Sequence, residues 1–411
     1  MSKYRTPSMI RTGILSAAIL FFLCLDPASA AKPKIPKWAQ KAIEATAQVP
    51  IFYEKKADAE NLLNEQIVTF GNKDAVEKVV ERRVIRILTP KGVRHGQNLA
   101  FYFDSQSKIK SIKAWTLKPD GKVIELPQKD IHETARYSDY RFYDDARYKT
   151  FGMPEVAQGD ILIIEVETHY MHPVWSTGFS GSWYIQDGWH GIPSYKVRFT
   201  LQLAPQWSYR YRLYNTNAQK PVHMEEKGYL WEWKHVKAPE NETGIERLSE
   251  LRYICTTEDP EWADRNRNSW DDLAAHYQRL SEGRLVLDDE MKQVVADLTK
   301  DRTTDLEKIR AIANYVRESL TYIAVEVGVG GYQPRHVQNI FKNKYGDCKD
   351  MSSMVVGMLG EAGITAYPAL ILTIDEGRID PGFPMQRFNH CIAYVPGVTE
   401  TEEWFEAWPG A

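Results

Sequence analysis

Residues 345–364 read YGDCKDMSSMVVGMLGEAGI and decide the fold of the second half of the chain. A short loop with Gly346 leads to Cys348. The apolar residues that follow recur at helical spacing: Met351, Met354, Val355, Met358 and Leu359. Gly363 is suited to end such a helix, because glycine readily adopts the left-handed conformation found there. The stretch predicts a helix that begins at or near Cys348.

A cysteine at a helix N-terminus is a candidate nucleophile. The unpaired N–H groups and the positive end of the helix dipole favour the thiolate, and the same N–H groups can stabilise an oxyanion. Asp347 and Asp350 flank this cysteine, and we interpret them as helix caps. We expect their side chains to point away from the sulfur, because a nearby negative charge opposes thiolate formation.

A thiol that attacks an amide needs a proton carrier, and His390 is the candidate. It lies 42 residues after Cys348, in FNHCIAYV (388–395), which has the pattern of a β-strand. Glu406 follows 16 residues later, on what we expect to be the adjacent strand of a hairpin, where its carboxylate can orient the imidazole. Cys391 is expected to point to the opposite face from His390, as a small buried residue.

The first thirty residues have the pattern of a secretory signal peptide. Three basic residues precede an apolar stretch over residues 13–25, and Ala28-Ser29-Ala30 matches a small-x-small cleavage site. The apolar stretch is shorter than the ~20 residues that a membrane-spanning helix needs. We expect cleavage after residue 30, a periplasmic or secreted protein, and no membrane span. The alternative is an uncleaved membrane anchor.

Residues 63–256 have the pattern of a β-rich domain, after a linker with a short helix over 31–62. Short β-branched segments predict strands at 79–88, 161–168 and 197–203, and Pro119-Asp120-Gly121 predicts a hairpin turn. Many short strands separated by turns are typical of an antiparallel sandwich-like domain.

Residues 128–155 stand out because they are rich in Tyr, Asp and Arg. We interpret them as a long polar loop, and the alternative is a surface that binds a ligand or partner.

Residues 257–411 are expected to form a helical connector followed by the core that contains Cys348. Helices are expected at 270–280, after Asp288 as a cap, and at 305–320. With the β-rich half, this predicts an α+β protein.

Composition excludes several classes of protein. The 411 residues contain 52 basic and 55 acidic side chains, and a net charge of −3 does not fit a nucleic-acid binder. We find no metal-ligand spacing and no phosphate- or dinucleotide-binding loop, so we expect neither a metal nor a cofactor. Three cysteines follow the signal segment. A disulfide between Cys255 and Cys391 that leaves Cys348 free is one arrangement the sequence allows.

Four short motifs resemble those of the transglutaminase-like superfamily in its bacterial secreted form. They are YGDCKD (345–350), GGYQP (330–334), RILTPKG (86–92) and KPDGK (118–122). The resemblance implies a papain-like core with a Cys-His-Asp site, preceded by a β-rich domain of uncharacterised function.

Carried over to this chain, the resemblance makes Cys348 the nucleophile and His390 the base. Glu406 is the best match to the third position, where the family usually has Asp. Tyr322 and Gln333 lie upstream, where similar folds place an oxyanion donor. The chain ends five residues after Glu406, which leaves a fragment and a natural truncation as alternatives.

Three kinds of function follow as hypotheses. The first is an enzyme that attacks peptide or glutamine amides of a protein or peptide substrate through a Cys348 thioester, resolved by water or an amine. The second is a weakly active or inactive envelope protein whose β-rich domain binds a peptide or glycan partner. The third is a glycan-binding module that uses the tryptophans of the β-rich domain: Trp183, Trp189, Trp231 and Trp233.

Overall fold

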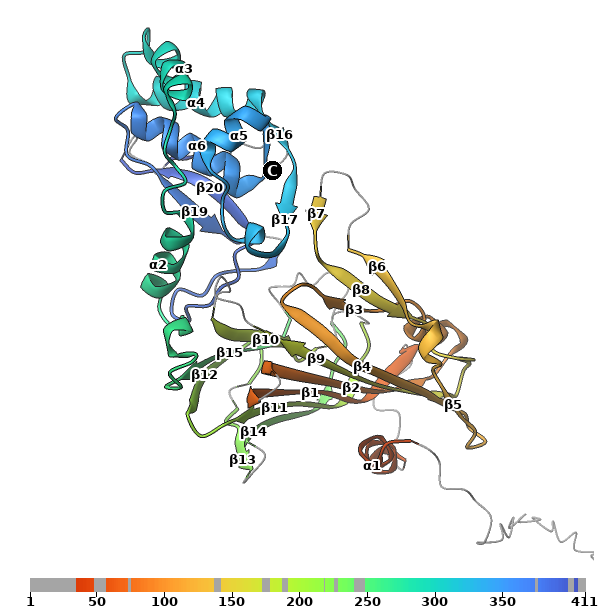
Figure 1. Ribbon diagram of the computed structural model, residues 1–411. Helices are drawn as coiled ribbons and strands as arrows, with labels where there is room; N and C mark the ends of the chain where they lie inside the picture. Colours follow the sequence, from red (N-terminus) through yellow and green to blue (C-terminus); the bar gives the residue numbers. More distant parts are fainter. Residues whose placement is uncertain are drawn as a thin grey trace, which may run out of the picture. The chain divides into compact units, whose positions relative to one another are not determined.

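The first half of the chain folds mainly as β-strands (Figure 1). The computed structural model describes residues 35–47, 57–72, 75–136, 142–171, 178–186, 191–217, 219–224, 228–239, 248–373, 376–397 and 403–405. The expected signal segment, Trp189 and Glu406 lie outside these residues. In the part of the chain that is described, no helix is long and apolar enough to cross a membrane.

An eight-stranded sheet forms the centre of the β-rich half. Its strands, in spatial order, are β13 (Val222–Met224), β14 (Gly228–Val236), β11 (Ser194–Leu203), β1 (Ala59–Asn72), β2 (Ala75–Ile87), β9 (Ile161–Tyr170), β4 (Ser107–Leu117) and β5 (Val123–Glu125). The three predicted strands are present as β2, β9 and β11, and the predicted turn joins β4 to β5. One pair departs from the antiparallel expectation, because β1 and β11 run parallel.

A second sheet covers one face of the first. It contains β10 (Phe179–Tyr184), β15 (Glu250–Thr257) and β12 (Trp207–Tyr214). Phe70, Phe199 and Trp231 of the large sheet pack against Phe179 and Tyr253 of the small one. The two layers confirm the sandwich-like architecture. Trp231 is 0% exposed, so its expected place on a glycan-binding surface is wrong: its ring fills the space between the sheets.

The other face of the large sheet is also covered. Helix α1 (Lys37–Thr46) places Ala39 against Leu63 and Ile163. A further sheet of β3 (Leu99–Phe103), β8 (Arg147–Phe151) and β6 (His132–Ala135) lies instead on the same face as the small sheet: its Leu99 and Phe151 pack against Ile85, which points to the same side of β2 as Val79 of the cluster under the small sheet. Burial on both faces explains why the β-branched runs alternate only partly with polar residues.

The expectation of a long polar loop over residues 128–155 is wrong. This segment contains β6, β7 (Phe142–Asp144) and β8. Strand β8 pairs antiparallel with both β3 and β6, and its Phe151 is buried. The Tyr- and Arg-rich composition hid these strands, because their exposed faces are polar.

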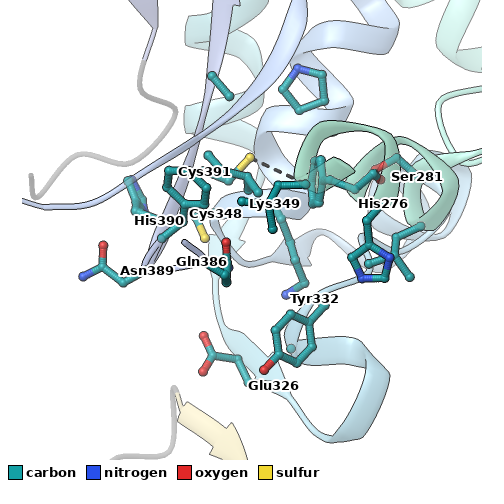
Figure 2. A pocket seen from close by; sticks show the side chains of 18 of the residues that line it. His276, Ser281, Glu326, Tyr332, Cys348, Lys349, Gln386, Asn389, His390 and Cys391 are labelled. Carbon is teal, nitrogen blue, oxygen red and sulfur yellow. Dashed lines mark hydrogen bonds between the residues drawn. The ribbon is translucent and has the colours of Figure 1, made fainter. Parts of the chain in front are cut away.

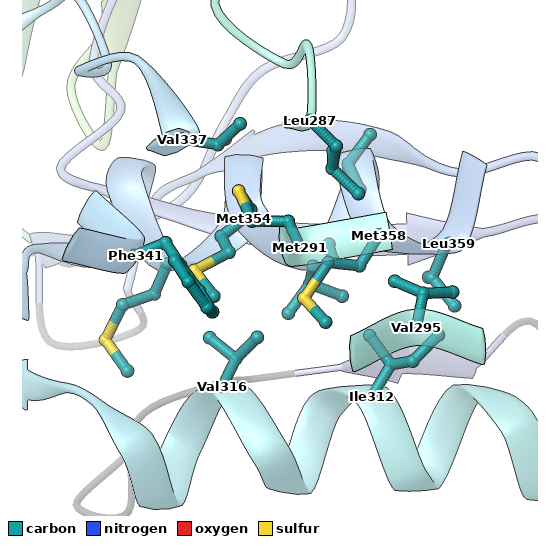
Figure 3. Packing of buried hydrophobic residues seen from close by; sticks show 14 of the residues in the cluster. Leu287, Met291, Val295, Ile312, Val316, Val337, Phe341, Met354, Met358 and Leu359 are labelled. Carbon is teal, nitrogen blue, oxygen red and sulfur yellow. The ribbon is translucent and has the colours of Figure 1, made fainter. Parts of the chain in front are cut away.

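The second half of the chain is built around helix α6 (Cys348–Glu361). It packs with α3 (Asp289–Thr299), α4 (Asp305–Ser319) and α5 (Val337–Asn343), and Figure 3 shows Met354 and Met358 of α6 among Val316 and Ile312 of α4. Helix α2 (Trp270–Ser281) precedes them. The predicted helices are confirmed, and Asp288 accepts a hydrogen bond from the Met291 amide as the cap of α3.

Candidate active site

Cys348 is the first residue of α6, as the sequence predicts. Asp347 is the N-cap residue: its carboxylate accepts a hydrogen bond from the Asp350 amide, while the Asp350 carboxylate accepts one from the Asp347 amide. This reciprocal box satisfies two backbone donors that the first turn of a helix leaves unpaired. The interpretation of both aspartates as caps is confirmed.

His390 begins strand β20 (His390–Val395). This strand pairs antiparallel with β19 (Tyr367–Ile371) on one side and with β21 (Glu403–Phe405) on the other, which confirms the expected hairpin. Glu406 comes directly after β21 and lies outside the described residues, so its role as the third catalytic residue stays a prediction.

Two hydrogen bonds connect helix α6 and strand β20 beside the Cys348 thiol. The Ser352 hydroxyl of the helix donates a 2.9 Å hydrogen bond to the Cys391 carbonyl. The Cys391 backbone N–H donates in turn to the Cys348 sulfur. Because Cys391 adjoins His390, these two contacts keep the start of the strand at the start of the helix.

A cavity of about 1520 Å³ lies at this junction, and both Cys348 and His390 line it (Figure 2). Figure 2 also shows Gln386 and Glu326 around the same space. A cavity of this size can admit a side chain of a peptide together with the neighbouring amide group. The structure thus brings the predicted nucleophile and the predicted base to one solvent-accessible space.

The thiol of Cys348 holds its proton strongly. Burial, followed by the charge of Asp347, raises its pKa to about 12, while Lys349 and the Cys391 amide act in the opposite direction. This direction is opposite to that of the dipole-stabilised thiolate that the sequence predicts. Burial removes water from the charged form and so favours the neutral thiol. Removal of the proton requires a base.

Lys349 and Asp347 form a buried ion pair next to the thiol. The ammonium donates to the Asp347 carboxylate, and both side chains are almost fully buried. Burial is the largest cause that raises the pKa of Asp347, to about 6, and Lys349 opposes this rise. The Asp347 carboxylate points toward the backbone amides that it caps. Its negative charge nevertheless raises the pKa of the Cys348 thiol.

The two predicted oxyanion residues have different places. Tyr322 lies on β16 (Thr321–Tyr322), lines the cavity, and its hydroxyl accepts a hydrogen bond from the Cys348 amide. Burial raises the pKa of Tyr322, so its hydroxyl keeps a proton that it can donate. Gln333 instead donates its side-chain amide to the Leu280 carbonyl at 3.0 Å. The structure brings Tyr322, but not Gln333, to the cavity lining.

Sequence reasoning missed several lining residues because they come from elements that look like ordinary packing. Tyr277 of α2 donates toward the Cys391 sulfur at 3.7 Å, and Gln386 precedes β20. Neither is part of a motif around Cys348. Only the register of α2 against β20 could have identified Tyr277.

The three described cysteines form no disulfide bond. Cys255, Cys348 and Cys391 are all free thiols, so the disulfide that the sequence allowed is not formed. Cys391 is 3% exposed, which confirms its expected burial. Among the described residues, no group of three or more His, Cys, Asp or Glu side chains is arranged to hold a metal ion.

Two family models match separate regions of the chain. Residues 292–407 match the transglutaminase-like superfamily, and residues 73–240 match a domain of unknown function, DUF3857. The chain therefore contains a region that matches DUF3857 and a C-terminal region that matches the transglutaminase-like superfamily, and the resemblance inferred from its motifs is confirmed. No curated protein matches the chain.

One solved structure shows a similar fold. The chain is similar to the crystal structure of "a putative protease" from Parabacteroides distasonis, with 15% sequence identity and a TM-score of 0.62, over 85% of this chain and 67% of that chain. At this identity the similarity shows the fold alone. A "putative cysteine protease" from Cytophaga hutchinsonii matches at 8% identity, over 80% of this chain and 75% of that chain, with a TM-score of 0.24 that supports no further argument.

Proposed function

We propose that this chain is a thiol acyl-transfer enzyme that acts on amide bonds of a protein or peptide substrate. The observation that supports this is the cavity shared by Cys348 at the start of α6 and His390 at the start of β20. The strongly held thiol proton gives His390 a definite task, because a neutral thiol is a poor nucleophile.

In the proposed reaction, His390 takes the proton from the Cys348 sulfur as the sulfur bonds to the amide carbon. The C–N bond then breaks, and His390 returns the proton to the departing nitrogen, which leaves a thioester. Water converts the thioester to a carboxylic acid, whereas an amine converts it to a new amide. Tyr322 is the proposed donor to the oxyanion, and Glu406 the proposed carboxylate that orients His390.

The test measures the alkylation rate of Cys348 against pH by peptide mass spectrometry. We compare the wild-type chain with His390→Ala, and use His132→Ala, an exposed histidine of β6, as the matched control. At pH 7 we expect His390→Ala to slow labelling at least tenfold, and His132→Ala to leave it unchanged. Equal rates in all three proteins, rising only in alkali, would contradict the proposal.

The second candidate is a binding or scaffold protein of the envelope whose β-rich domain holds a peptide or glycan. The observation that favours it is the raised pKa of Cys348, which is what an inert buried thiol shows. Peptide turnover by the wild type that Cys348→Ala abolishes would reject this candidate. Both proposals include a periplasmic or secreted location, to which the predicted signal peptide at residues 1–30 would direct the chain.

A further inference from the structure

The segment that leads into His390 lies against the small sheet (β10, β15 and β12) of the β-rich half. Residues 380–387 come just before the cavity-lining residues Phe388, Asn389 and His390. The segment contacts the small sheet near its start, in its middle and at its end. The residues that make these contacts are Asp380, Phe383, Met385 and Arg387. The chain therefore enters β20 from the surface of the small sheet.

Arg387, at the end of the segment, is bound by Glu250 of β15. Its Nη1 atom lies 2.7 Å from one carboxylate oxygen of Glu250, and the two side chains are only 13% and 6% exposed. Its Nη2 atom donates to the Tyr184 hydroxyl at 3.5 Å. The other carboxylate oxygen of Glu250 accepts from Arg252 at 2.9 and 3.0 Å. Since a buried charge that loses its partner is costly, this pair fixes Arg387 three residues before His390.

Asp380, at the start of the segment, is bound by β12. Its Oδ2 atom accepts a 2.6 Å hydrogen bond from the Tyr214 hydroxyl and lies 2.5 Å from the Arg212 guanidinium. The Tyr214 ring lies under the Arg252 guanidinium, 4.2 Å from the ring centre. Because Arg252 also binds Glu250, one network of side chains on the small sheet holds both ends of the segment.

The middle of the segment is buried on the same sheet. Phe383 and Met385 are 4% and 6% exposed and pack with Ile254 of β15. The guanidinium groups of Arg210 and Arg212 each lie 5.5 Å from the centre of the Phe383 ring. Apolar burial and ionic contacts therefore act together on this short segment, and both come from the β-rich half.

We propose that Glu250, through Arg387, is a positioning residue for His390, so that the small sheet holds the proposed base at the Cys348 thiol. This inference rests on the proposed acyl-transfer function and gives the β-rich half a part in it. Neither Glu250 nor Arg387 lines the cavity, so both act through the residue that does. A base must lie within hydrogen-bond reach of its proton, and a displacement of about 1 Å can cost about 10²-fold in rate.

The first measurement is hydrogen–deuterium exchange of the full chain, read by peptide mass spectrometry. In Glu250→Gln, which removes the charge that binds Arg387, the peptide at the start of β20 should exchange several-fold faster, because that strand end opens more often. The matched control is Glu165→Gln, which removes a carboxylate that accepts from Arg82 at 2.8 Å on the large sheet. The control should leave exchange at the start of β20 unchanged.

The second measurement is the rate at which iodoacetamide alkylates Cys348 at pH 7. Glu250→Gln should slow labelling about fivefold or more, toward the rate of His390→Ala. Adding Glu250→Gln to His390→Ala should change the rate no further, because the two residues act as one unit. A general loosening around the thiol would instead change the rate in both backgrounds. Arg387→Lys, which keeps a charge for Glu250, should label faster than Arg387→Gln.

Tyr214→Phe keeps the test valid where Glu250→Gln fails to fold. This variant removes only the hydroxyl that donates to Asp380 and keeps the ring under Arg252. It should raise exchange at the start of β20 and slow Cys348 labelling, both by less than Glu250→Gln would. A folded Tyr214→Phe protein that shows neither change would then overturn the inference.

The two measurements separate this inference from the proposed function. Equal labelling rates in the wild type and His390→Ala overturn the acyl-transfer proposal, and exchange at β20 still shows whether the small sheet holds His390. Unchanged exchange in a folded Glu250→Gln protein overturns the positioning role. Faster exchange with normal, His390-dependent labelling overturns it as well, because His390 would then act without the contact between Glu250 and Arg387.

Discussion

Cys348 lies at the positive end of a helix and still keeps its proton. The sulfur is largely removed from water, and the Asp347 carboxylate that caps the same helix adds a negative charge. Helix dipoles stabilise an adjacent charge by a few tenths to about 2 kcal/mol, while burial of a charged group shifts a pKa by several units. The larger effect determines the protonation state. A resting thiol protects a nucleophile from adventitious oxidation until a base and substrate act on it.

The charge of Asp347 contributes to the raised pKa of Cys348, and a substitution at Asp347 tests this contribution. In Asp347→Asn the amide can still cap the helix, but the negative charge beside the sulfur is gone. We expect the pKa of Cys348 to fall by about one unit, so alkylation at a fixed pH below the pKa accelerates about tenfold. The pH dependence of alkylation, followed at the Cys348 peptide, measures this shift.

Thermal unfolding of Asp347→Asn serves as the control, because the variant also leaves Lys349 without its carboxylate. A buried charge that loses its partner destabilises the fold by roughly 3–5 kcal/mol. A lower melting temperature together with an unchanged Cys348 pKa would show that Asp347 acts on the fold alone.

Helix α6 holds Cys348 in place because it is anchored at both its first turn and its middle. Near the start, the Arg335 guanidinium contacts the buried Asp350 carboxylate at 2.7 and 2.9 Å. In the middle, Gly357 lets the chain near Leu285 lie directly on the helix: a Cβ at this position would approach the Leu285 carbonyl to 2.8 Å. Glycine usually weakens a helix, so its presence here reflects this close contact.

Two glycines of α6 therefore respond in opposite ways to alanine. We expect Gly357→Ala to lower the free energy of unfolding by about 1–3 kcal/mol, because a rigid backbone oxygen must move. A Cβ added at Gly360 would meet no atom within 4 Å. Gly360→Ala should therefore raise the free energy of unfolding by roughly 0.5–1 kcal/mol, because alanine favours the helix more than glycine does. Urea denaturation of both variants measures the difference, and equal stabilisation by both would refute the contact.

Among the residues that the structure describes, three largely buried thiols make the free energy of unfolding depend on pH in the alkaline range. Burial raises the pKa of Cys348 to about 12 and that of Cys391 to about 11, and it raises the pKa of Cys255 well above its usual value. Unfolded thiols ionise near pH 8.5. Above this pH the unfolded chain releases protons that the folded chain keeps, so stability is complete below pH 8.5 and is lost as pH rises.

We expect the free energy of unfolding to fall by up to about 4 kcal/mol per pH unit between pH 8.5 and 10, since each thiol contributes up to about 1.4. Cys255→Ala should remove about a third of this slope. Leu251→Ala, on the same strand and equally buried, should lower stability at every pH without a change in slope. Urea titrations under reducing conditions test this, and a slope unaffected by Cys255→Ala would contradict it.

Much of the architecture was predictable from local patterns. The strands β2, β9 and β11, the helices α2 to α4, and the start of α6 at Cys348 follow from periodicity and capping residues. Strand β7 was not predictable, because it pairs with β17 (Ala324–Glu326), about 180 residues further along the chain, and local composition holds no trace of such a partner. Strands β6 and β8 pair with nearer segments, and their polar residues concealed them.

Sequence alone determined the helix that begins at Cys348, its aspartate caps and the strand that begins at His390, because these depend on neighbours within a few residues. Only the tertiary structure decided that the thiol stays protonated, that Gln333 is engaged elsewhere, and that Asp144 of the first domain lies at the cavity of the second. Burial and long-range strand pairing set these properties. Both arise from contacts between residues that are far apart in the chain.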